Sequence, residues 1–203
     1  FREKVEQEWA HIRGGSNTLS SAAVEKVKNH FQPIDYPQHD DSSMNRELAS
    51  QRLESPEFAR WLDKNTLAHK QAGYAIVNLA LKPTGIAPGD ITDVQMDAIA
   101  DLADQYSNGQ LRNTHHQNIV LADVCKTDLW SLWRAIDALG LATPNLGYLS
   151  DPICCPGGDY CALANAKSIP VAEAIQSKFD DIDYLYDLGP IDLNISGCMN
   201  ACG

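Results

Sequence analysis

The segment that decides the fold is YAIVNLALKPTGIAPGDITDVQMDAIADLADQY, residues 74–106. Its first nine residues, 74–82, alternate between two faces and predict a strand. The stretch PTGIAPGD that follows holds two prolines and two glycines and predicts a loop. Residues 92–107 then show helical spacing of apolar side chains, and Thr92 with Gln95 forms a capping-box pattern at the start. The segment therefore predicts a strand, a loop and an amphipathic helix.

The residues that follow this segment extend the pattern. Residues 110–124 read as a strand, a bend and a second strand. Residues 127–140 predict a helix with Thr127 as its N-cap and Gly140 as its stop. Residues 73–140 thus predict the order β-α-β-β-α, which is typical of a two-layer α+β unit.

The flanks of this unit are less regular. Residues 1–31 and 46–65 predict helices, and the Pro-, Asp- and Ser-rich stretch 32–45 predicts a linker between them. Towards the C-terminus, residues 162–181 predict a helix interrupted near a proline, and residues 191–197 predict a strand.

The composition narrows the class of protein. The chain has 203 residues, 44% of them apolar, which is enough for a sizeable core. Its formal net charge of −11 argues against nucleic acid as a partner. No apolar run approaches the ~20 residues that cross a bilayer, and no signal peptide is visible, so we expect no membrane contact and a cytoplasmic location. The chain does not begin with Met, and we expect it to be a segment of a longer protein.

Five of the six cysteines gather in two short stretches, CCPGGDYC and GCMNACG. Five residues separate Cys155 from Cys161, and three separate Cys198 from Cys202. Zinc suits the second spacing but fits the first loosely. Disulfides usually spread along a chain, and this clustering disfavours them. Burial as free thiols is the preferred interpretation for the isolated Cys125.

A 4Fe–4S cluster is the remaining interpretation of the paired cysteines. Four thiolates from two loops can enclose a cubane, since soft sulfur ligands select iron–sulfur chemistry. Small residues beside the ligands would let the backbone approach the inorganic core and donate N–H groups to its sulfurs. These residues are Gly157, Gly158, Gly197, Ala201 and Gly203. The spacing alone leaves zinc and a cluster nearly even.

Two longer motifs carry a resemblance to a known family. The first is C-x5-C followed, after about 36 residues, by G-C-x-N-x-C-G. The second is LR-x-T-x-x-Q-N at residues 111–118. Together they resemble the sulfite and nitrite reductase family, whose second half carries this cysteine signature after a ferredoxin-like unit. The resemblance covers roughly residues 56–203 and is nearer to bacterial assimilatory sulfite reductases than to plant-type nitrite reductases.

The resemblance implies a division of the chain. Residues 1–65 would be a helical linker from the preceding domain, residues 66–141 a ferredoxin-like half-domain, and residues 142–203 the truncated start of an iron–sulfur and sirohaem domain. The expected fold class is α+β. On its own, the chain is expected to be inactive, because the family draws most of its anion-binding basic residues from the first half.

The resemblance also implies cofactors and the residues that hold them. The 4Fe–4S cluster would be ligated by Cys155, Cys161, Cys198 and Cys202. The thiolate of Cys202 would also bridge to the iron of sirohaem and act as the catalytic ligand. Further residues expected near the cofactors are Asn200, Ala164, Arg112 and Gln117. The roles of Cys154 and Cys125 stay open.

The implied activity is the six-electron reduction of sulfite to sulfide in sulfur assimilation, with a flavoprotein or a ferredoxin as electron donor. Nitrite reduction to ammonia is the alternative within the same family. A non-catalytic module that binds zinc or a cluster is the alternative from another class.

Overall fold

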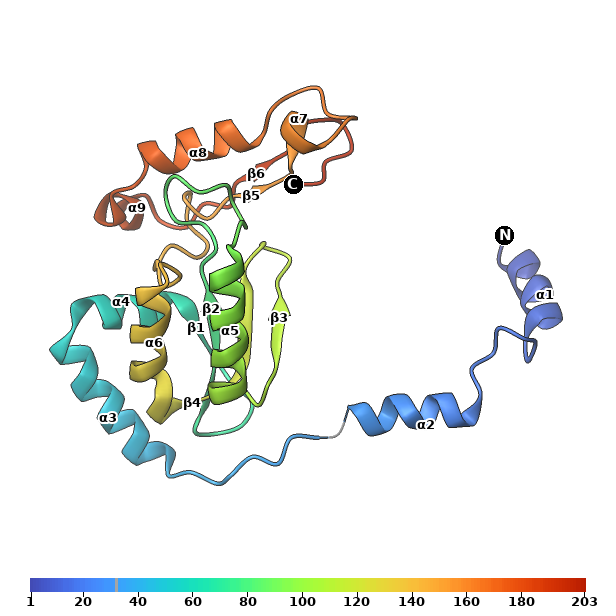
Figure 1. The fold of residues 1–203 in the computed structure, drawn as a ribbon, viewed down its shortest axis with the longest axis horizontal. Helices are drawn as coiled ribbons and strands as arrows, with labels where there is room; N and C mark the ends of the chain where they lie inside the picture. The colour runs from blue at the N-terminus through green and yellow to red at the C-terminus, as the bar shows by residue number, and fades with distance from the viewer. Residues whose placement is uncertain (32) are drawn as a thin grey trace. The chain divides into compact units, whose positions relative to one another are not determined.

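The computed structural model describes residues 1–31 and 33–203 of the chain (Figure 1). They form two compact units, Phe1–Pro37 and Gln38–Gly203. The predicted linker 32–45 begins with a residue that lies outside the described part.

The first unit contains two helices, α1 (Arg2–Ile12) and α2 (Ser21–His30). The hydroxyl of Ser20 caps α2 by accepting a hydrogen bond from the N–H of Ala23 at 3.1 Å. Neither helix contains a buried residue. The prediction of helices in residues 1–31 is confirmed, with a break between α1 and α2.

The second unit is built on an antiparallel sheet with the strand order β1-β2-β4-β3. Its strands are β1 (Thr66–Ala68), β2 (Tyr74–Leu79), β3 (Leu111–Asn113) and β4 (Ile119–Cys125). In the two central strands Val77 pairs with Leu121, and both side chains are fully buried. The alternation read from the sequence of β2 therefore marks a real core face.

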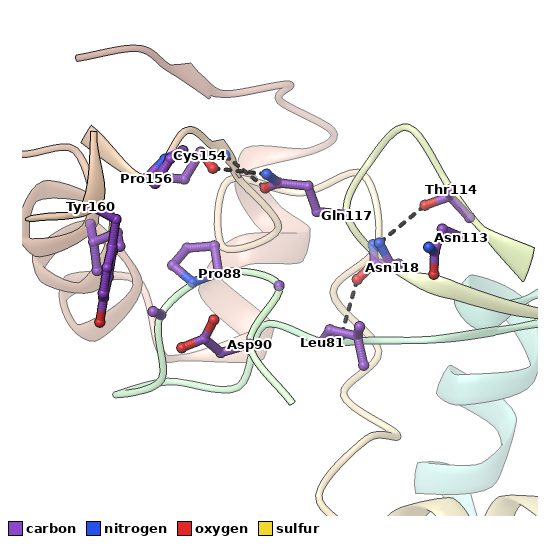
Figure 2. Close-up of a pocket in the computed structure, with 13 residues that line it drawn as sticks. Leu81, Pro88, Asp90, Asn113, Thr114, Gln117, Asn118, Cys154, Pro156 and Tyr160 are labelled. Carbon is purple, nitrogen blue, oxygen red and sulfur yellow. Dashed lines mark hydrogen bonds between the residues drawn. The ribbon is translucent and has the colours of Figure 1, made fainter. Parts of the chain in front are cut away.

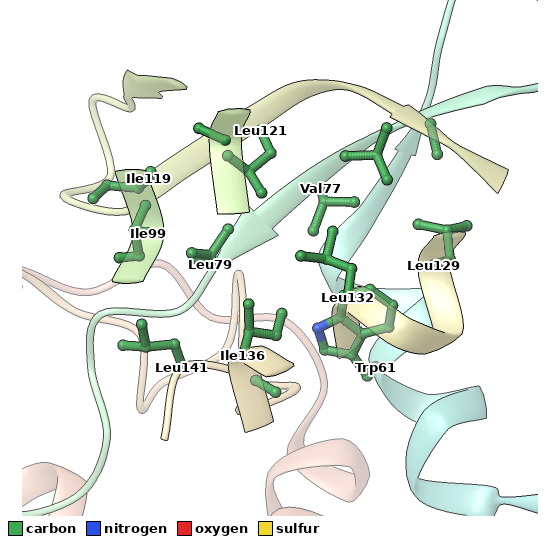
Figure 3. Close-up of a cluster of buried hydrophobic side chains, with 14 of the residues drawn as sticks. Trp61, Val77, Leu79, Ile99, Ile119, Leu121, Leu129, Leu132, Ile136 and Leu141 are labelled. Carbon is green, nitrogen blue, oxygen red and sulfur yellow. The ribbon is translucent and has the colours of Figure 1, made fainter. Parts of the chain in front are cut away.

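Four helices belong to this part of the second unit: α3 (Asp41–Glu54), α4 (Pro56–Asn65), α5 (Asp93–Tyr106) and α6 (Leu129–Ala138). The core that α4, α5 and α6 share with β2 and β4 is shown in Figure 3. Its labelled side chains are Trp61, Val77, Leu79, Ile99, Ile119, Leu121, Leu129, Leu132, Ile136 and Leu141. The predicted order β-α-β-β-α is confirmed as β2-α5-β3-β4-α6; β1 was not predicted.

Two helix N-caps are predicted from the sequence, one for α5 and one for α6. The capping box of α5 is present, because the Thr92 hydroxyl accepts from the N–H of Gln95 and the Gln95 side chain accepts from the N–H of Thr92. The predicted Thr127 cap of α6 is wrong. A 3₁₀ turn (Lys126–Asp128) precedes that helix, and the Thr127 hydroxyl lies 3.2 Å from Sγ of Cys125 instead.

The C-terminal part contains short elements. Two strands, β5 (Ile153–Cys154) and β6 (Asn194–Ile195), pair in parallel. Between them lie α7 (Gly157–Tyr160), α8 (Ile169–Lys178) and α9 (Ile182–Leu188). The predicted helix 162–181 is wrong before Ile169, and the predicted strand 191–197 is only two residues long. The α+β class is confirmed.

Candidate functional site

The parallel pairing of β5 with β6 brings the two cysteine-bearing stretches side by side. Cys154 pairs with Ile195, and the N–H of Cys155 donates to the carbonyl of Ile195 at 3.0 Å. Cys155 and Cys161 belong to the first stretch, and the last two cysteines follow β6 directly. The pairing of these two-residue strands therefore fixes how the two expected ligand pairs, distant in sequence, lie beside each other.

The thiol of Cys155 lies in a defined polar environment. Its Sγ accepts a hydrogen bond from the N–H of Gly197 at 3.1 Å and lies 3.3 Å from the hydroxyl of Ser168. The Ser168 hydrogen bond, followed by the Gly197 N–H, lowers the pKa of Cys155 below its ordinary value. Groups that donate to a sulfur favour its thiolate, the form that binds metal.

The neighbouring thiol of Cys154 has the opposite tendency. It is buried, and burial is the largest cause that raises its pKa to about 11. Its Sγ donates to the carbonyl of Cys155 at 3.3 Å. The environments of the two neighbouring thiols therefore shift their pKa values in opposite directions.

The glycines of the two stretches bring backbone segments close together. A Cβ added at Gly197 would lie 2.7 Å from the carbonyl oxygen of Ala166, and one added at Gly203 would clash with that of Ile195. Gly157 has a φ of +57° and would place a Cβ 2.5 Å from the backbone nitrogen of Ser168. These glycines are therefore required by backbone packing around Cys155, in addition to any approach to a cluster.

The other three expected ligands are more open. Cys161 and Cys198 are partly exposed, Cys202 is exposed, and all six cysteines of the chain are free thiols. Among the residues that the structure describes, no group of three or more His, Cys, Asp or Glu side chains is arranged to hold a metal ion. Four thiols on two paired segments are the type of ligand set that suits an iron–sulfur cluster. The four sulfurs are not brought together around one point in this structure.

The cysteine stretch is held to the sheet by the tip of the β3–β4 hairpin (Figure 2). The side-chain amide of Gln117 donates to the carbonyl of Cys154 at 2.8 Å and accepts from its N–H at 2.9 Å. Asn118 donates from Nδ2 to Oδ1 of Asp151 at 3.1 Å and accepts from the N–H of Leu81 at 2.9 Å. The hairpin tip is thus bonded at two points to the stretch that leads into Cys155.

A buried ion pair supports the same junction. Lys82 has a fully buried side chain, and its Nζ lies 2.7 Å from Oδ1 of Asp151. It also donates to the carbonyl of His116. Desolvation by burial lowers the pKa of Lys82, and the charge of Asp151 partly offsets this. Sequence reasoning missed Lys82 and Asp151, because no local pattern links two residues so far apart in the chain.

Comparison with known proteins supports the resemblance. Residues 69–139 match the sequence model of the nitrite/sulfite reductase ferredoxin-like half domain. These residues span β2, α5, β3, β4 and α6. The central part of the chain is therefore similar to the ferredoxin-like half domain of nitrite and sulfite reductases.

Curated sulfite and nitrite reductases are similar to this chain at 28–30% sequence identity. A sulfite reductase (ferredoxin) of Mycobacterium tuberculosis is 30% identical over 128 residues, which cover 60% of this chain and 23% of that protein. Sulfite reductase (ferredoxin) 1 of Mycolicibacterium paratuberculosis is 28% identical over 145 residues, 68% of this chain and 26% of its own. A ferredoxin–nitrite reductase of Synechococcus elongatus is 28% identical over 157 residues, 73% of this chain and 28% of its own.

A solved structure agrees with the fold. The Mycobacterium tuberculosis NirA protein aligns with a TM-score of 0.55 and 25% identity, over 68% of this chain and 25% of that one. The chain therefore spans about a quarter of the length of the relatives it matches. No helix in the described part of the chain is both long and apolar enough to cross a membrane.

The remaining residues expected near the cofactors lie in different settings. Arg112 is exposed on β3 and donates to the side chain of Gln110 at 2.9 Å. Asn200 is exposed and Ala164 is partly buried, each in a loop that follows a cysteine. Cys125 is partly exposed, 3.8 Å from Nε2 of His39.

A cavity of about 450 Å³ opens beside the hairpin tip (Figure 2). The loop after β2, the hairpin tip and the cysteine stretch line it. Its polar side chains are Asp90, Asn113, Thr114, Gln117, Asn118 and Tyr160. The junction that holds Cys154 is therefore also one wall of a polar cavity.

Proposed function

We propose that this chain is part of a sirohaem- and 4Fe–4S-dependent reductase that converts sulfite to sulfide in sulfur assimilation. The observation that carries the proposal is the pairing of β5 with β6, which aligns the C-x5-C and C-x3-C stretches beside a family half-domain. Relatives named as ferredoxin-dependent sulfite reductases support sulfite as the anion and a ferredoxin as the electron donor.

The cluster would be held by Cys155, Cys161, Cys198 and Cys202, with Cys202 also reaching the iron of sirohaem. When bound, the two groups supply one-electron transfer and an iron that binds the oxyanion. Cys155 contributes a thiolate that the Gly197 N–H and the Ser168 hydroxyl stabilise. Cys202 is exposed, so its sulfur is accessible to a second cofactor. Asn200, Ala164 and Arg112 remain proposed cofactor neighbours.

The ligand assignment can be tested with a matched pair of variants. In the full-length protein, Cys155→Ser should lose iron and acid-labile sulfide. Cys154→Ser should keep both, because that thiol is buried, has a raised pKa and donates to a carbonyl as a serine hydroxyl would. Loss of iron from Cys154→Ser with retention in Cys155→Ser would reverse the assignment.

The reaction can be tested with the full-length protein, supplied with sirohaem and reduced ferredoxin. Sulfide formed from sulfite, with a higher kcat/KM than for nitrite, is the expected result. Ammonia from nitrite without sulfide from sulfite would favour the alternative that the relative from Synechococcus elongatus represents. A colourless protein with bound zinc would favour the non-catalytic module.

The cytoplasmic location, the inactivity of the isolated chain and the division at residues 65 and 141 remain predictions.

A further inference from the structure

The side chain of Gln117 binds the backbone of the cysteine stretch as a neighbouring strand would. Its amide contacts both the N–H and the C=O of Cys154, at 2.9 and 2.8 Å (Figure 2). Cys154 immediately precedes Cys155, and the N–H of Cys155 is bonded on the other side to Ile195. The peptide backbone around Cys155 is therefore fixed from two directions.

The backbone of Gln117 is itself held in an uncommon conformation. Its φ is +55°, in the left-handed region that non-glycine residues seldom occupy. A tight turn holds it there, since the N–H of Gln117 donates to the carbonyl of Thr114 at 3.2 Å. Gly89, with a φ of +86°, packs so closely that an added Cβ would lie 3.3 Å from Cβ of Gln117. Such conformations persist where the surrounding structure fixes them, often at functional sites.

A second anchor lies four residues before Cys155. The carboxylate of Asp151 accepts from Asn118, from the N–H of Gly147 at 3.0 Å and from Lys82. Asp151 holds the start of the segment that leads into Cys155, whereas Gln117 binds Cys154 at the end of that segment. Only the Gln117 contact is adjacent to the expected ligand, so it has the more direct control over where that sulfur lies.

The sulfur of Cys155 accepts a hydrogen bond from a backbone N–H that is distant in sequence. Gly197, whose N–H bonds to that sulfur at 3.1 Å, belongs to the stretch after β6. N–H donors to ligand sulfurs are one determinant of the reduction potential of an iron–sulfur cluster. A shift of the Cys154 peptide would change this N–H···S contact without altering any ligand.

We infer that Gln117 is a positioning residue for the Cys155 thiolate: its amide fixes the Cys154 peptide and thereby the contact between Cys155 Sγ and the Gly197 N–H. This assigns Gln117 a role through the protein backbone rather than through direct cofactor contact. The consequence for the cluster potential rests on the proposed function, whereas the positioning itself is a property of the chain.

The first test needs no cofactor. Amide hydrogen exchange is measured residue by residue in the full chain without metal, for the wild type, Gln117→Met, Gln117→Glu and the control Asn113→Ala. Asn113 is exposed and lines the same cavity. In Gln117→Met, exchange at Cys154 and at Gly197 should both accelerate about tenfold, equivalent to about 1.4 kcal/mol. In Gln117→Glu the exchange rates at Cys154 and Gly197 should lie between those of the wild type and Gln117→Met, because glutamate keeps the acceptor oxygen and loses the N–H donor.

The exchange rate of the Gly197 amide distinguishes a positioning role of Gln117 from a purely local structural role. Acceleration at Cys154 with an unchanged rate at Gly197 would overturn the inference, and so would equal rates in Gln117→Met and the wild type. In the loaded full-length protein, Gln117→Met should shift the cluster reduction potential while Asn113→Ala does not. If the wild type binds zinc and no cluster, the proposed function fails, and the exchange result still decides the positioning role.

Discussion

Replacement of Lys82 by Met tests the buried junction between the sheet and the cysteine stretch. The ammonium group of Lys82 is fully buried, 2.7 Å from Asp151, and the change removes the charge while keeping a long apolar side chain. Asp151 would keep its bonds from Asn118 and Gly147 but lose its counter-charge. Breaking a buried ion pair from one side costs about 3–5 kcal/mol, and the two remaining donors place our expectation near about 3 kcal/mol.

The assay is urea unfolding of the full chain, followed by tryptophan fluorescence. Asp151→Asn should be destabilising by a similar amount, because it leaves the Lys82 ammonium buried without a carboxylate. The double variant should be less destabilised than the sum of the two single variants. The exposed Lys70→Met serves as the control and should change stability by less than about 0.5 kcal/mol. A cost below about 1 kcal/mol for Lys82→Met, or strict additivity in the double variant, would show that Lys82 and Asp151 do not form a stabilising buried pair.

The same pair makes a prediction about pH. Because burial lowers the pKa of Lys82 below its ordinary value of 10.5, the unfolded chain binds more protons than the folded chain between the folded-state pKa and 10.5. The contribution of Lys82 to stability must therefore rise with pH in that window. The stability difference between the wild type and Lys82→Met should widen from neutral pH towards pH 10. A gap that narrows over this range would contradict the lowered pKa.

Three further predictions concern other parts of the second unit. Thr92→Ala removes the capping box of α5 and should cost about 1 kcal/mol in urea unfolding; no change would mean that the cap is redundant. Leu132→Ala empties a fully buried core position and should cost about 2–5 kcal/mol, a result that a shift below about 1 kcal/mol would contradict. Gly197→Ala would place a Cβ 2.7 Å from the carbonyl of Ala166 and should reduce iron retention, whereas Gly158→Ala meets ordinary contacts at 3.5 Å and should retain iron. Equal iron content in the two glycine variants would show that the backbone approach is not required.

Local rules predicted much of the half-domain. The capping box at Thr92 and the alternation in β2 depend on residues close in sequence, and both were predictable. The three residues of β1 were missed because so short a segment has no readable period. The Thr127 cap was wrong because a 3₁₀ turn displaced the start of α6, a competition that local propensity does not resolve.

The candidate site was predicted less completely, for a related reason. The cysteine spacing pointed to the paired stretches, but the contacts that fix Cys155 come from distant segments. Gln117 was noticed within a motif, and its bonds to Cys154 could be found only in three dimensions. Lys82 looks like an ordinary surface lysine in sequence, since its partner Asp151 lies far along the chain.

We propose that these cysteines hold an iron–sulfur cluster coupled to sirohaem. The most direct test of this proposal is the visible spectrum of the full-length protein, made with sirohaem biosynthesis intact, together with iron and acid-labile sulfide analysis. We expect sirohaem absorption with about four further irons and about four sulfides per chain, the content of one cubane. A colourless protein that contains zinc and no labile sulfide would contradict the proposal.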